Sequence, residues 1–96
     1  MKSYENLLVI AMEEAAEVQQ ELSKVLRFGI NNYHPDDPSL SNGRRVMYEF
    51  NQLKAVISLL QDRNILPVLN DYEEKLIMDN KINAIKKWSS KSNIKD

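Results

Sequence analysis

The sequence predicts an all-α fold, a bundle of three to four helices, and three observations indicate it. Apolar residues recur at alternating spacings of three and four, as they do along one face of a helix. Glycine occurs only twice and proline three times, so long stretches carry no helix breaker. β-Branched residues do not alternate with polar ones, as they would in a half-buried strand.

The first helix is expected from about Tyr4 to Phe28. Ser3 is a plausible N-cap, and Gly29 a plausible stop, because glycine tolerates the backbone conformation found just past helix ends. Its apolar stripe consists of Leu8, Ala11, Ala15, Val18, Leu22 and Val25.

The second helix is expected from about Gly43 to Arg63, with Ser41 or Asn42 as its cap. Two helices with such stripes pack as an antiparallel pair at a shallow angle. The stripe of this helix consists of Val46, Phe50, Leu53, Ile57 and Leu60.

The third helix is expected to begin near Pro67 or Asn70 and to continue to about Trp88. Its apolar half-stripes change register near Asp79, which favours a break or bend at that point. Residues 89–96 read as a frayed tail, and residues 29–42 as a long polar loop between the first two helices.

Length and composition favour one small domain, residues 1–96, in the cytoplasm. The chain has no cysteine, and its N-terminus shows neither a secretory signal nor a membrane span. A domain of this size buries a modest share of its surface, so self-association would help to stabilise it. The net charge of −1 argues against bulk nucleic-acid binding, although residues 81–96 carry five lysines and a single acid.

Glutamates form a stripe of their own on the first helix. Glu14, Glu17 and Glu21 each precede an apolar stripe position by one residue, so we expect them at the edge of the apolar face. Glu49 and Gln52 hold the same place on the second helix. Pairing of the two helices would let Glu14, Glu17 and Glu49 converge at the rim.

Two interpretations of this convergence stay open. Clustered carboxylates bind hard divalent cations such as Mg²⁺, which takes further ligands from water and phosphate. Glutamate is also a strong helix former that is common on exposed helix surfaces, where it binds nothing.

Three blocks of the sequence resemble, in order, the MazG-like all-alpha NTP pyrophosphatases, and most closely the short phage and bacterial members. The blocks read "EEAAEVQQELSKVLRFG", "YEFNQLKAVISLLQ" and "KINAIKKWSSKS". The family pattern is E-x-x-E on one helix and E-x-x-D on the next. Glu14, Glu17 and Glu49 match it, whereas Gln52 replaces the aspartate.

The resemblance implies a homo-oligomeric helical bundle, a dimer or tetramer, located in the host cytoplasm if the gene belongs to a phage. It implies hydrolysis of nucleoside triphosphates to monophosphate and pyrophosphate, with Mg²⁺ (or Mn²⁺) held by the acids. Gln52 can still ligate the metal through its amide oxygen, but glutamine has no charge and cannot act as a base. Either a neighbouring acid, Glu21 or Glu13, compensates and activity survives, or the protein binds and sequesters a nucleotide without hydrolysing it. A third alternative is a helical interaction protein that binds no nucleotide.

Basic and aromatic residues supply candidates for the phosphates and the base. Lys24 and Arg27 continue the acidic side of the first helix, where they could equally interact with the helix dipole. Lys81 and Lys86 are candidates on the third helix by the resemblance, or part of a solvated basic face. Trp88 could stack on a base, as could Phe28, Tyr33 or Tyr48, although aromatic side chains more often cover a core.

Overall fold

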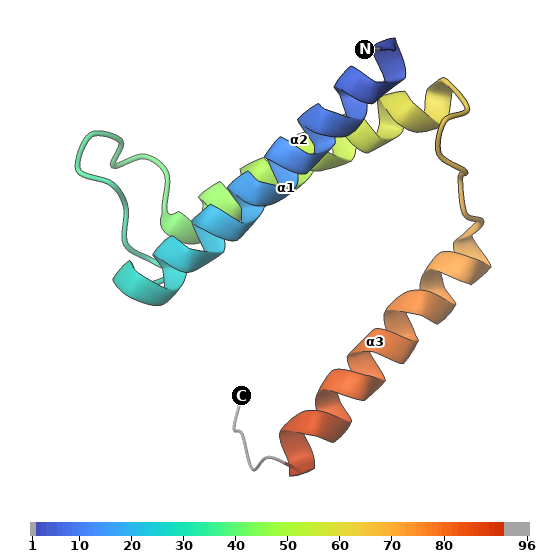
Figure 1. Ribbon diagram of the computed structural model, residues 1–96. Coiled ribbons are helices and arrows are strands. Elements are labelled where there is room, and N and C mark those ends of the chain that lie inside the picture. The colour runs from blue at the N-terminus through green and yellow to red at the C-terminus, as the bar shows by residue number, and fades with distance from the viewer. Residues whose placement is uncertain (1, 92–96) are drawn as a thin grey trace.

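The computed structural model describes residues 2–91, which form three α-helices (Figure 1). They are α1 (Ser3–Phe28), α2 (Asn42–Asp62) and α3 (Asp71–Lys91). Within the described residues the only β-pairing is an isolated bridge between Tyr33 and Ser41. The predicted all-α fold class is confirmed.

The ends of α1 and α2 are set by local hydrogen bonds. Gly29 ends α1 at φ 96°, and its N–H donates to the Val25 carbonyl over 2.9 Å. Ser41 caps α2, because its Oγ accepts from the Arg44 N–H at 3.2 Å. The expectation for Ser3 was wrong: Lys2 is the cap residue and makes no side-chain capping bond, so Ser3 is already helical.

The loop between α1 and α2 is tied to both helices by hydrogen bonds. The backbone N–H groups of Asn42 and Gly43 donate to the carbonyls of Asn32 and Ile30 at 2.7 and 2.9 Å. The Asn42 side chain, 5% exposed, donates to the Gly29 carbonyl at 3.0 Å. These bonds hold the start of α2 against the end of α1.

α1 and α2 pack as the expected antiparallel pair, with the loop at one end (Figure 1). The contact face, however, is rotated from the predicted stripes. Ala15, Leu22 and Phe50, expected in the core, are exposed, whereas Glu14 and Glu21 are withdrawn from solvent. The positions that face the partner helix follow alternating spacings of four and three: residues 7, 11, 14, 18, 21 and 25 of α1, and residues 42, 46, 49, 53, 56 and 60 of α2.

α3 begins after Asn70, whose Oδ1 accepts from the Glu73 N–H at 2.8 Å as an N-cap. The expected bend near Asp79 is absent, because α3 runs unbroken to Lys91 and three residues past the predicted end at Trp88. The rest of the predicted frayed tail, residues 92–96, lies outside the described residues. α3 makes no extended packing contact with α1 or α2 (Figure 1), although Glu74 in its first turn lines a hollow on α2 together with Phe50 and Ile57.

Little of the apolar surface is covered in one chain. Leu60, which is 0% exposed, is the single fully buried apolar side chain among the described residues. In the same part of the chain, twenty-two large apolar side chains are exposed. No helix between residues 2 and 91 is both long and apolar enough to cross a membrane.

Candidate functional site: an acidic helix seam

Three glutamates lie in the seam between α1 and α2. Glu14 and Glu21 are two helical turns apart on α1, with Val18 between them on the same face, and Glu49 comes from the facing side of α2. Because the contact positions recur at alternating spacings of four and three residues, Glu14, Glu21 and Glu49 lie in the helix contact. Leu22 lies outside it. The acids therefore lie inside the contact, more deeply than the rim position that the sequence predicts.

Burial leaves these carboxylates short of partners. Glu21 is 6% exposed, and its Oε1 accepts from the Lys24 Nζ at 3.1 Å. The other oxygen of Glu21, and Oε2 of Glu14, are buried and have no hydrogen-bond partner. Because an unpaired buried carboxylate oxygen is costly, the seam favours a bound proton or cation.

Glu49 shows the same need for positive charge. Its pKa is raised above the ordinary value of 4.5, first by loss of solvation. Repulsion from the Glu14, Glu17 and Glu21 carboxylates, and a hydrogen bond with the Glu14 carboxyl, raise the pKa further. Four glutamates thus act on one another electrostatically across two helices.

Glu17 and Gln52, the other two predicted ligands, are exposed. Glu17 follows Glu14 by one turn and still lies close enough to raise the pKa of Glu49. Gln52 follows Glu49 by one turn of α2 but adds no charge. Both residues belong to the open edge of the seam.

The donor set fits a hard cation in its chemistry, because carboxylate oxygens are the ligands that Mg²⁺ prefers. The two unpaired oxygens of Glu14 and Glu21 add a demand for positive charge. As placed, however, no three Asp, Glu or His side chains of residues 2–91 stand together in a geometry that could hold one ion. Side-chain rotation would have to complete a metal site in this seam.

A pocket of about 300 Å³ opens where α1 meets the loop and α2. Its lining includes two cationic side chains, Lys24 and Arg45, and two aromatic ones, Phe28 and Tyr33. Lys24 also reaches the Glu21 carboxylate, so the pocket adjoins the acidic seam.

Arg45 was missed by the sequence reasoning. Its Nη2 donates to Asp37 Oδ2 at 3.0 Å, and its Nε is buried without a partner. Hydrogen bonding from Ser39, together with the positive charge of Arg45, lowers the pKa of Asp37. The sequence signal was weak, because Arg45 reads as an ordinary residue in the first turn of α2.

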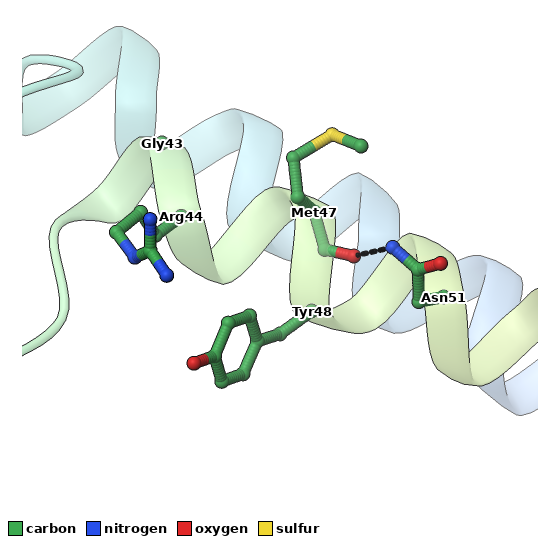
Figure 2. Close-up of a pocket in the computed structure, with 5 residues that line it drawn as sticks. All are labelled: Gly43, Arg44, Met47, Tyr48 and Asn51. Atoms are coloured by element: carbon green, nitrogen blue, oxygen red, sulfur yellow. Dashed lines mark hydrogen bonds between the residues drawn. The ribbon is translucent and has the colours of Figure 1, made fainter.

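A second hollow, of about 520 Å³, lies on α2 alone (Figure 2). Gly43, Arg44, Met47, Tyr48 and Asn51 line it, and Asn51 donates to the Met47 carbonyl at 2.7 Å. These positions lie on the side of α2 opposite the seam, so this hollow brings no acid to a ligand. Tyr48 is therefore separated from the carboxylates.

The remaining candidates are divided between two places. Arg27 lies near the end of α1, where its guanidinium stands over the Phe28 ring at 5.0 Å. Lys81, Lys86 and Trp88 are on α3, which makes no extended packing contact with either seam helix. A single chain therefore does not bring the predicted phosphate-binding residues of α3 to the acids.

Comparison of the chain with family models, curated proteins and solved structures gave no match.

Proposed function

We propose that the protein binds a nucleoside triphosphate through Mg²⁺ held by the seam carboxylates and hydrolyses it to monophosphate and pyrophosphate. The observation that carries this proposal is the buried, unpaired Oε2 atoms of Glu14 and Glu21 beside Glu49. Such a group favours a bound proton or cation, and a metal–phosphate complex would supply a cation together with a ligand. The resemblance of the sequence to MazG-like pyrophosphatases supports the same chemistry.

The residues have separable roles in this proposal. Glu14, Glu17, Glu21 and Glu49 would hold the metal, with the amide oxygen of Gln52 as a neutral ligand. Bound Mg²⁺ neutralises phosphate oxygens and favours attack by water. A carboxylate whose pKa is raised is a better proton acceptor, so Glu49 is suited to take the proton of the attacking water.

Cationic groups for the triphosphate would come from two regions. Lys24 and Arg45 line the pocket beside the seam, and Phe28 and Tyr33 offer faces on which a base can stack. Lys81, Lys86 and Trp88 reach a seam only if chains self-associate, and we propose a homo-oligomer, a dimer or tetramer, that acts in the cytoplasm.

The second candidate function is nucleotide binding without hydrolysis, and Gln52 is the observation that favours it. The uncharged amide removes one negative charge from the expected ligand set and provides no base. A protein with this seam would hold an intact nucleotide and release no pyrophosphate.

Pyrophosphate release from a panel of nucleoside triphosphates with Mg²⁺ tests the proposal. Wild type is expected to turn over, and Glu14→Gln to lose at least about 100-fold, the usual size of one positioned acid–base or charge contribution. Glu13→Gln, on the exposed side of α1, is the matched control.

A Gln52→Asp variant separates the two candidates. Gain of activity from a silent wild type would establish a binding protein that has lost hydrolysis. Silence in every variant, together with no nucleotide binding, would overturn both and leave a helical interaction protein.

A further inference from the structure

Hydrogen bonds hold the segment that follows α2 against the end of that helix as far as Pro67. The N–H groups of Ile65 and Leu66 donate to the Leu60 carbonyl at 2.9 and 3.3 Å. The Gln61 side chain donates to the Pro67 carbonyl at 3.2 Å.

The hairpin keeps an uncovered apolar face beside the seam. Leu22 and Leu26 of α1 lie on the same side of the pair as Phe50 of α2, because all three are displaced in the same sense from the contact face. All three side chains are exposed, Leu26 by 89%.

α3 carries a second uncovered apolar face over its C-terminal half. Ile77, Met78, Ile82, Ile85 and Trp88 fall on one side of the helix, and all are exposed. Lys81 lies within this side, and Lys87 lies opposite to it. α3 has 21 residues, as α2 has, so it can span the hairpin over about 31 Å.

The exposed area is too large for a lone folded chain. The accessible surface is 7986 Å² for 11.2 kDa, whereas a folded monomer of this mass exposes roughly 5,700 Å². The excess is about 2,300 Å² per chain, or about 4,600 Å² for two chains, and obligate dimers bury roughly 2,000–5,000 Å² over both partners. The radius of gyration is 16.7 Å, against about 12.5 Å for a compact chain of this length.

Charge favours the hairpin of a second copy as the partner of α3. The C-terminal half of α3 is basic, with Lys81, Lys86 and Lys87, whereas the hairpin seam and its edge are acidic. Pairing α3 with another α3 in parallel would bring these lysines together. Pairing α3 with a hairpin avoids this repulsion.

From these observations we infer that two copies exchange α3, so that the apolar face of each α3 covers the hairpin of its partner. Each acidic seam then belongs to a bundle built from both chains. The inference rests on the proposed self-association but not on nucleotide hydrolysis, because an inactive protein can still exchange its helix.

Engineered cysteines test the exchange without background, because the full chain contains no cysteine. Chains with Phe50→Cys are unfolded and refolded together with chains carrying Met78→Cys, Ile82→Cys or Ile85→Cys, and then oxidised. We expect a disulfide between the two kinds of chain for at least one position, and none with Lys87→Cys, the control on the opposite side of α3. A matched double variant, Phe50→Cys with Ile82→Cys, is expected to give covalent dimers.

Solution mass and an interface variant complete the test. Native mass should be at least twice the chain mass of 11.2 kDa. Ile82→Asp should raise the dissociation constant by roughly 30-fold or more, as for a well-buried interface anchor. A monomeric wild type, absence of every cross-link, or disulfides that form only within one chain would overturn the exchange. Pyrophosphate release is scored separately, so its loss would not count against this inference.

Discussion

Buried carboxylate oxygens without partners are the most informative feature at the scale of single residues. Glu14 and Glu21 each place one oxygen in the α1–α2 contact where no donor meets it. A structural role alone would select leucine at these positions, because such acids weaken the pairing of two helices. Their presence in the contact is the physical argument for a bound proton or cation, and the proposed function assigns a cation.

Glu49 should make stability depend on pH in metal-free buffer. A carboxyl group with a raised native pKa contributes stability that is present below its ordinary value of 4.5 and is lost as pH rises through the raised value. The glutamine of the Glu49→Gln variant does not titrate, so this variant does not lose stability in that way. The free energy of unfolding of Glu49→Gln minus that of wild type should therefore increase from pH 4.5 to neutral pH. Urea titrations at a series of pH values would measure it, and an equal effect of Glu13→Gln would contradict the account.

Magnesium should relieve the same repulsion. A ligand that binds only the folded protein stabilises it by about 2.7 kcal/mol at a hundredfold excess over its dissociation constant. We therefore expect Mg²⁺ to raise the melting temperature of wild type, and to raise that of Glu14→Gln much less. Differential scanning calorimetry with and without EDTA would measure this, and an equal shift in both proteins would place the metal elsewhere.

At the scale of helices, sequence patterns gave the elements more accurately than their faces. Stripe spacing located α1 and α2 to within a few residues, and Gly29 and Ser41 marked helix ends correctly. The contact face was predicted only in part, because the sequence offers two overlapping stripes on α1, one through Glu14 and Glu21 and one through Ala15 and Leu22. Both stripes share Ala11, Val18 and Val25. Which stripe meets α2 depends on what covers the other, and a local pattern does not contain that information.

The sequence predicted the glutamate cluster more completely than the cationic residues around it. Acids recur one position before the apolar residues, and this pattern alone predicted that Glu14, Glu17 and Glu49 converge. Arg45 could not be found this way, because its place beside Lys24 depends on how the loop returns. The lysines of α3 were linked to the acids by resemblance alone, and one chain keeps them apart.

Gly29 should be intolerant of a side chain. Its φ of 96° and ψ of 149° lie in a region that is nearly restricted to glycine, so Gly29→Ala should cost about 1–3 kcal/mol of unfolding free energy. Asn31→Ala, an exposed neighbour in the same loop, is the control. Chemical denaturation would measure both, and equal stability of the two variants would show that the loop adjusts without strain.

At the scale of the whole molecule, the hairpin and α3 are two parts with complementary uncovered faces. One fully buried apolar side chain among residues 2–91 cannot offset the conformational entropy of ordering them. The stable particle is therefore expected to be an assembly, and the acidic seam is expected to work inside it.

If the folded protein is an assembly, its stability should fall when the protein is diluted. Trp88 is the sole tryptophan and is 60% exposed in one chain, on the face of α3 that we assign to the partner. Its fluorescence maximum should move to longer wavelength as protein concentration falls, and the melting temperature should fall with it. Fluorescence and melting that do not change with concentration would contradict the assembly.

The central claim is that the seam directs hydrolysis between the α and β phosphates, and phosphorus NMR of the reaction tests it most directly. Wild type with Mg²⁺ and a nucleoside triphosphate should give the resonances of nucleoside monophosphate and pyrophosphate, and Glu49→Gln should give neither. Appearance of nucleoside diphosphate and orthophosphate, or equal product formation by wild type and Glu49→Gln, would contradict the account.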